Sequence, residues 1–132
     1  MNQRTRLYRY VYYISIIILF VLIVIKAYLS YYKILNNNKL TYGSVTDIIS
    51  EYRGSGIYVD FSCLVDGKTY TGTTWVEIRP RYMNFFLYKQ FPVIYEINDP
   101  SNNDILITSR QFKEYNIIFP DSLRWVDSFL TK

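Results

Sequence analysis

Residues 57–76 read IYVDFSCLVDGKTYTGTTWV, and this stretch decides the fold of the region around it. Its first half alternates so that one face of an extended strand is wholly apolar. That expected core face consists of Ile57, Val59, Phe61, Cys63 and Val65. Asp66-Gly67 follows at once and favours a tight hairpin, because both residue types tolerate positive φ. We therefore predict the strand Ile57–Asp66 and a return strand, Lys68–Val76, whose threonines and aromatics suit a pleated surface.

Three further strands are predicted around this hairpin. Tyr42–Ile49 comes before it, with Val45 and Ile48 facing inward, and residues 51–56 form a flexible turn. Pro92–Ile97 and Asp104–Thr108 come after it, separated by a turn cluster at residues 98–103. Five strands in about seventy residues are too few for a large sandwich. They predict a mostly antiparallel bent sheet or a small partly open barrel, occupying residues 41–110.

The C-terminal extension, residues 111–132, changes period. Residues 111–119 are ambiguous, whereas residues 120–130 carry apolar side chains on one helical face. The members of that face are Leu123, Val126, Phe129 and Leu130. Asp121 or Ser122 is suited to cap its start. We predict a short amphipathic helix here.

A transmembrane anchor is predicted near the N-terminus. Residues 11–25, VYYISIIILFVLIVI, carry no charge and span roughly 22 Å as a helix. Extension to residue 32, with Lys26 snorkelling to the headgroups, makes the segment long enough to cross. Tyrosines gather at both ends, as in the aromatic belts of membrane helices. The side chains assigned to the anchor are Tyr12, Tyr13, Ile16, Leu19, Leu22, Ile25, Lys26 and Tyr28.

Two alternatives to this anchor are a buried core helix and a cleaved signal peptide. A buried helix has no need of two tyrosine belts, and the KAYLSYY that follows Ile25 lacks the small residues that signal peptidase requires. We therefore expect a retained anchor at residues 11–32, between a basic flank at residues 1–10 and a polar linker at residues 33–40.

The charges divide unevenly along the chain. Residues 1–39 have a net charge of +6 and residues 40–132 a net charge of −2. A slightly acidic domain argues against nucleic-acid binding, which needs a basic face. The arginines of the N-terminal flank, Arg4, Arg6 and Arg9, favour a cytoplasmic N-terminus. The expected location is a cell inner membrane, crossed once, with the β domain in the periplasm or outside the cell.

Catalytic and metal-binding chemistry has little support in this sequence. Histidine is absent, and the single cysteine, Cys63, alternates with core residues. Gly54-Ser55-Gly56 lacks the lysine of a phosphate loop. Asp60 and Asp66 could flank a substrate, and Asp99 and Asp104 with nearby asparagines could bind calcium, but a solvated strand face and a turn are the better explanations. We expect no catalytic residue, metal, cofactor or small-molecule substrate.

Residues 77–91 form the most distinctive stretch of the domain, because basic side chains lie among many aromatic ones there. Such side chains are typical of interaction hot spots and of surfaces on anionic headgroups. The alternative is that the aromatics cap one end of the barrel. The candidate partner-binding residues are Arg79, Arg81, Tyr82, Phe85, Phe86, Tyr88 and, from the C-terminal helix, Trp125.

The order of motifs resembles a widespread bacterial family of unknown function. Gly43-Ser44-Val45, Asp66-Gly67-Lys68-Thr69-Tyr70 and Asp99-Pro100-Ser101-Asn102 correspond to its first strand, its "DGKxY" hairpin and its "DPxN" turn. The resemblance covers about residues 41–107 and implies short membrane-anchored proteins with a small β domain. This chain lacks the glycine that the family has before its last hydrophobic strand, and the resemblance implies no activity.

Three functions are compatible with this sequence. The first is a non-enzymatic membrane-anchored interaction module, acting as an accessory subunit of a bacterial envelope complex and binding another protein or a second copy of the chain. The second is an anchored immunity protein that neutralises a toxin. The third is an envelope hydrolase, which requires at least two of four carboxylates to converge. These are Asp60, Asp66, Glu77 and Glu96.

Overall fold

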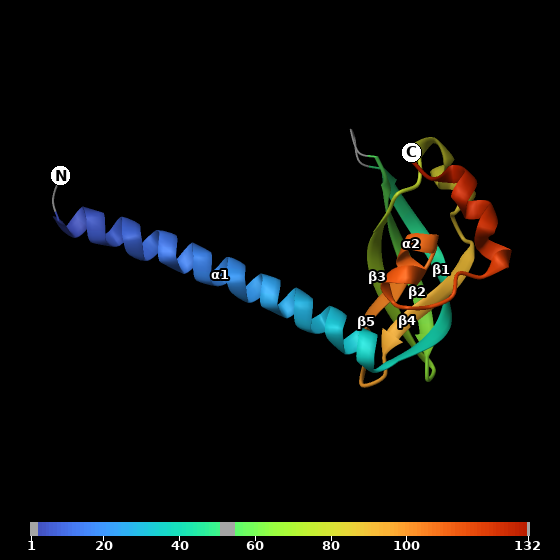
Figure 1. Cartoon of the computed structure of the whole chain (residues 1–132), viewed down its shortest axis with the longest axis horizontal. Coiled ribbons are helices and arrows are strands. Elements are labelled where there is room, and N and C mark those ends of the chain that lie inside the picture. Colours follow the sequence, from blue (N-terminus) through green and yellow to red (C-terminus); the bar gives the residue numbers. More distant parts are fainter. Residues whose placement is uncertain (1–2, 51–54, 132) are drawn as a thin grey trace. The chain divides into compact units, whose positions relative to one another are not determined.

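The computed structural model describes residues 3–50 and 55–131, with side chains from residue 8 onward. It has a long N-terminal helix, five strands and three short helical segments (Figure 1). The chain divides into two units between Lys33 and Ile34. The first unit is helical, and the second contains the whole sheet.

Helix α1, Gln3–Asn36, contains one segment, Tyr8–Asn36, that is long and apolar enough to cross a membrane. Its large apolar side chains between Val11 and Ile25 are all exposed, and so are Tyr12, Tyr13 and Tyr28. Such a surface is unfavourable in water but suits lipid. The helix is consistent with single-pass anchoring.

The predicted linker at residues 33–40 is wrong. Helix α1 continues to Asn36, and the first strand begins at Asn38. The Asn38 side chain donates hydrogen bonds to the carbonyls of Ile34 (2.7 Å) and Leu35 (3.2 Å), which satisfies orphan acceptors at the helix end. The asparagines therefore stop the helix and start the strand within two residues.

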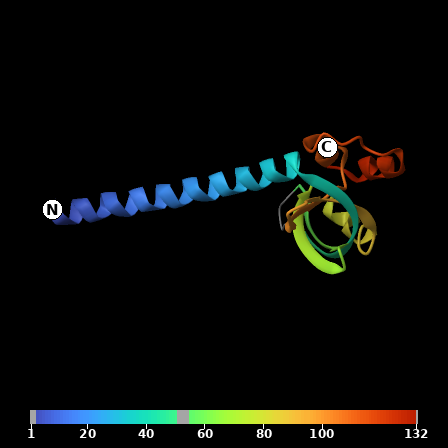
Figure 2. The same ribbon diagram turned by 90° about the horizontal axis from the view of Figure 1, so that it is seen from below.

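The sheet has the order β3-β2-β1-β4-β5 with every neighbouring pair antiparallel. Its strands are β1 Asn38–Ser50, β2 Ile57–Val65, β3 Lys68–Val76, β4 Gln90–Glu96 and β5 Asp99–Ile105. The edge strands β3 and β5 approach each other without pairing, so the sheet forms a nearly closed barrel (Figure 2). This confirms the predicted fold class.

The hairpin of β2 and β3 forms as predicted. Asp66 and Gly67 have φ angles of 50° and 76°, and the strands pair from Ile57–Val76 to Val65–Lys68. All five residues of the expected core face are buried, and they join Val45, Val76 and Phe91 in the barrel interior. Residues 51–54 of the predicted turn before β2 lie outside the described residues.

The second predicted turn is shorter than expected. The chain turns at residues 97–98, and Asp99-Pro100-Ser101-Asn102 already belongs to β5. Pairing jumps from Glu96–Asp99 to Tyr95–Asn103, so residues 100–102 form a bulge. Asp99 accepts a hydrogen bond from the Ser101 amide at 3.2 Å. The turn-forming residues therefore bend a strand instead of ending it.

Three short helical segments cover the barrel. They are η1 Pro80–Phe85, α2 Ser109–Glu114 and η2 Asp121–Phe129. The amphipathic C-terminal helix is present as η2, a 3-10 helix, and neither Asp121 nor Ser122 caps it. Its core contacts Leu123, Val126 and Phe129 are spaced by three, a period that a 3-10 helix aligns on one face.

A second apolar cluster lies on the outer face of β4. It joins Ile34, Ile94, Leu106 and Phe112, with Tyr115, Ile117, Phe119 and Leu123 packed against it. The residues 111–119 that were ambiguous in the sequence therefore form part of this outer layer. The last turn of α1 belongs to the same layer through Ile34.

Candidate functional site

The aromatic and basic segment, residues 77–91, packs against η2. Phe85 stacks on Phe129 with ring centroids 5.1 Å apart, and Phe86 stacks on Trp125 at 5.5 Å. Tyr82 meets Phe129 edge to face at 5.0 Å. Backbone bonds join the two segments as well, because the Arg79 amide donates to the Phe129 carbonyl at 3.0 Å. The aromatics thus form one continuous cluster.

Burial divides the candidate partner-binding residues into two groups. Phe86 is fully buried and contributes to the core, so its assignment to a binding surface is wrong. Tyr82, Trp125 and Arg79 are half-buried. Phe85 and Tyr88 are 51% and 76% exposed, and Arg81 is exposed too. The segment therefore contains both buried aromatics that cap the barrel and side chains that are exposed.

Cations lie over three of the exposed or half-buried rings. The Lys89 ammonium is 4.7 Å from the Phe85 ring centroid and 5.7 Å from that of Trp125. The Arg81 guanidinium is 4.7 Å from the Tyr82 ring. The chain has no acidic residue between Glu77 and Glu96. We call Arg81, Phe85, Tyr88 and Lys89 the Tyr88 surface; it combines exposed aromatic area with positive charge.

Tyr88 occupies the left-handed backbone region, with φ 61°. Its amide donates to the Val45 carbonyl, and the Val45 amide donates to the Lys89 carbonyl, each at 3.0 Å. These two bonds to β1 hold the chain in place at this point. A bulky side chain at positive φ costs of order 1 kcal/mol or more, which glycine avoids. Because its ring is exposed, Tyr88 offsets little of this cost by packing.

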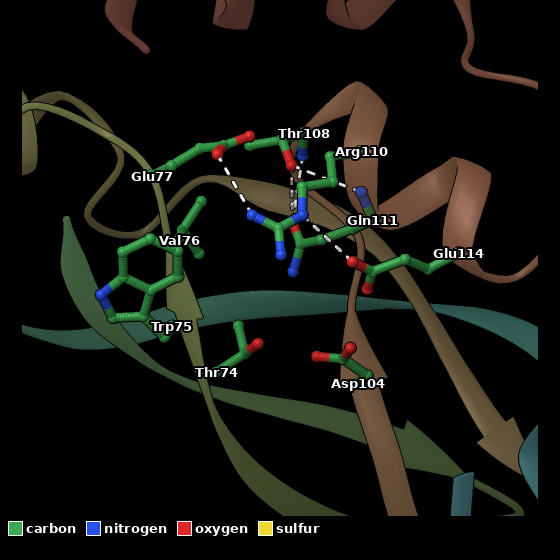
Figure 3. A pocket seen from close by; sticks show the side chains of 9 residues that line it. All are labelled: Thr74, Trp75, Val76, Glu77, Asp104, Thr108, Arg110, Gln111 and Glu114. Atoms are coloured by element: carbon green, nitrogen blue, oxygen red, sulfur yellow. Dashed lines mark hydrogen bonds and ion pairs between the residues drawn. The ribbon is translucent and has the colours of Figure 1, made fainter. Parts of the chain in front are cut away.

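A small pocket lies where β3, β5 and α2 meet (Figure 3). Its volume is about 90 Å³, and residues lining it include Thr74, Glu77, Asp104, Arg110 and Glu114. Figure 3 shows Arg110 lying between Glu77 and Glu114, with nitrogen–oxygen distances of 3.4 and 3.2 Å. These contacts fasten α2 to the end of β3 across the seam of the barrel, which is the gap between the edge strands β3 and β5.

Asp104 lies at the same seam. Burial raises the pKa of its carboxyl above the ordinary value, although hydrogen bonds from Thr74 and Tyr115 and from the Ile105 backbone oppose the shift, and the charge of Glu114 adds to it. The Tyr115 hydroxyl donates to Asp104 Oδ2 at 3.1 Å. The carboxyl thus joins β3, β5 and the end of α2.

The seam between β3 and β5 was not predicted from the sequence, although a local signal for part of it exists. Thr108-x-x-Gln111 is a capping box, and both of its hydrogen bonds form at the start of α2. Gln111 is buried and also donates to the Ile105 carbonyl at 2.9 Å. The space is small, about 90 Å³, and the side chains of Glu77, Arg110 and Glu114 that line it already bond one another. We therefore regard the seam pocket as a packing contact that holds α2 against β3 and β5.

The four carboxylates of the hydrolase hypothesis lie apart. Asp60 accepts a hydrogen bond from Thr73 on the outer sheet surface, and Asp66 is at the hairpin tip six residues further along, about 20 Å in a strand. Glu77 pairs with Arg110, and Glu96 accepts from Asn102 at 3.0 Å. These side chains therefore do not converge in the way that a carboxylate mechanism requires.

The remaining candidate sites are explained by structure. Asn103 donates to the Pro100 carbonyl at 2.7 Å, so its amide stabilises the β5 bulge. Within residues 3–50 and 55–131, no three side chains of the metal-binding types come together. Cys63 is buried, and burial raises the pKa of its thiol, which disfavours the reactive thiolate.

Comparison with known proteins gives no relative from which a function could be transferred. No family model matches the chain, and no curated protein and no solved structure matches it either. The resemblance based on the "DGKxY" and "DPxN" turns stays a prediction. We therefore infer the function from this chain's own geometry.

Proposed function

We propose that the protein is a non-enzymatic, membrane-anchored interaction module that binds another protein through the Tyr88 surface. The physiological role that fits best is an accessory subunit of a bacterial envelope complex. A helix suited to single-pass anchoring and a small barrel support this proposal. So do the exposed aromatic and cationic side chains of the Tyr88 surface, since such residues dominate protein interfaces.

The observation that carries the proposal is the strained and exposed position of Tyr88. A tyrosine at φ 61° with a 76% exposed side chain costs conformational energy and gives the fold little packing in return. Backbone strain of this kind concentrates at functional sites. Phe85 lies within the same surface and is half-exposed, with Lys89 over its ring. Together they offer an anchor suited to a partner with apolar and acidic side chains.

The proposed location is the inner membrane of a bacterial cell. Three arginines precede the apolar segment within nine residues, whereas Lys26, Lys33 and Lys39 are spread over fourteen at its other end. This bias favours a cytoplasmic N-terminus and a β domain in the periplasm or outside the cell.

Co-purification of the full-length chain from native membranes in mild detergent tests the binding role. The test variant combines Arg81→Glu with Phe85→Ser, two exposed positions whose change leaves the buried Phe86 intact. Ile118→Ser is the control, because Ile118 is 91% exposed and lies outside the Tyr88 surface. We expect wild type and Ile118→Ser to retain one stoichiometric protein that the double variant loses. Equal recovery of that protein with the double variant would reject the Tyr88 surface.

The identity of the retained protein separates the forms of this function. A resident envelope protein supports the accessory subunit, and a secreted toxin would identify an immunity protein. A second copy of the chain would point to self-association.

A further inference from the structure

A row of apolar side chains is exposed on the outer face of the sheet, near the start of β1. Leu40, Tyr42 and Leu64 are 52%, 69% and 61% exposed. Gly43 of β1 pairs with Cys63 of β2, so the next residues along the antiparallel strands, Tyr42 and Leu64, lie opposite each other. On the β4 side, Tyr42 pairs with Pro92. Leu40 pairs with Ile94 and therefore lies on the same face. We call Leu40, Tyr42 and Leu64 the β1 patch.

The β1 patch departs from the polarity expected of an outer face. Where this face continues along β1 and β2, it carries paired serines, Ser44 and Ser62. The neighbouring Ile94 is fully buried beneath the outer apolar cluster. The fold covers Ile94 and leaves the β1 patch uncovered. An antiparallel sheet with one solvated face is polar on that face, so these side chains call for an apolar environment.

The chain itself limits where the β1 patch can go. Leu40 follows the last residue of α1, Asn36, by four residues, a reach of at most about 14 Å. Asn36 also ends the segment suited to cross a membrane. Leu40 is thus tethered within about 14 Å of the end of that segment. Residues 1–46 contain no acidic side chain, and positive charge is carried by Lys33 in the last turn of α1 and by Lys39 at the start of β1. Anionic headgroups are therefore attracted to this part of the chain.

We infer that the β1 patch rests in the interface of the bilayer, with Tyr42, Leu40 and Leu64 among the headgroups of anionic lipids. Tyrosine suits this layer, since its ring is apolar and its hydroxyl stays hydrated. The contact adds a second membrane attachment to the anchoring helix and restricts rotation of the domain. It is independent of the Tyr88 surface, which consists of different residues, so either assignment can fail without the other.

Depth-dependent quenching in liposomes tests this contact. The full-length chain carrying Cys63→Ala receives one new cysteine, labelled with an environment-sensitive fluorophore, at Tyr42 or Leu64. Ile49→Cys is the matched control, an exposed apolar position at the far end of β1. The liposomes contain phosphatidylglycerol and phosphatidylcholine, with nitroxide-labelled lipid as the quencher. Circular dichroism of each labelled protein verifies that the sheet has formed.

We expect quenching at residues 42 and 64 to exceed that at residue 49 several-fold. We also expect the difference to shrink when phosphatidylglycerol is replaced by phosphatidylcholine. Quenching at residues 42 and 64 no stronger than at residue 49 would overturn the inference. A difference that is unchanged without the anionic lipid would overturn the part that depends on charge.

Discussion

At the scale of single residues, three positions other than glycine hold positive φ angles within the described chain. Asp66 at 50° forms the β2–β3 hairpin, and Asn116 at 56° follows α2. Both residue types enter this region readily because their short polar side chains bond locally. Tyr88 at 61° has a bulky side chain that cannot form such local bonds. The positive φ angles of Asp66 and Asn116 are therefore explained by turn chemistry, whereas that of Tyr88 suggests a functional role.

The seam residue Asp104 predicts a pH dependence of stability. Its folded-state pKa is raised, so the folded protein keeps a proton at a pH where the unfolded chain has lost it. The stabilising contribution is complete below the unfolded pKa of about 3.9 and is lost as pH rises through the folded pKa. Asp104→Asn cannot ionise, yet it can still accept the Tyr115 hydrogen bond.

The measurement is urea unfolding of wild type and Asp104→Asn in the same detergent at pH 4 and pH 7. We expect the wild type to lose free energy of unfolding relative to the variant as the pH rises. A constant difference between the two proteins would show that the pKa of Asp104 is not raised in the folded state.

At the scale of elements, features held by interactions between residues close in sequence were predictable, and features held by distant residues were not. The β2–β3 hairpin was predictable because strict alternation and an Asp-Gly turn are both local. The outer apolar cluster was not, since Ile34, Ile94, Leu106 and Phe112 come from distant parts of the chain. Ile34 had been assigned to a linker for the same reason. Nor could the sequence decide between Phe85 and Phe86, because only the packing of η1 determines which ring turns inward.

The 3-10 helix η2 gives a prediction for this scale. Val126 is its one fully buried residue, so Val126→Ala should lower the free energy of unfolding by roughly 1–3 kcal/mol. Arg124→Ala is the control on the same helix. It removes an exposed ion pair with Asp121, which should cost less than about 1 kcal/mol. Thermal unfolding compares the two variants, and equal losses would mean that η2 does not dock through Val126.

At the scale of the whole molecule, the proposed topology can be tested with one cysteine. Ile118 is 91% exposed in the second unit, and the native Cys63 is buried. In intact cells, a membrane-impermeant maleimide should label Ile118→Cys and leave the wild type unlabelled. Labelling only after the inner membrane is broken would place the β domain in the cytoplasm and reverse the orientation.

The interaction role is tested most directly by Tyr88→Gly, measured for stability and for partner retention in the same preparation. Glycine relieves the positive φ, so the free energy of unfolding should stay constant or rise by about 1 kcal/mol. We predict that this equally stable or more stable protein no longer retains the partner that wild type carries from native membranes. Undiminished retention by a stabilised Tyr88→Gly would contradict the account, because the strained tyrosine would then serve neither the fold nor the interaction.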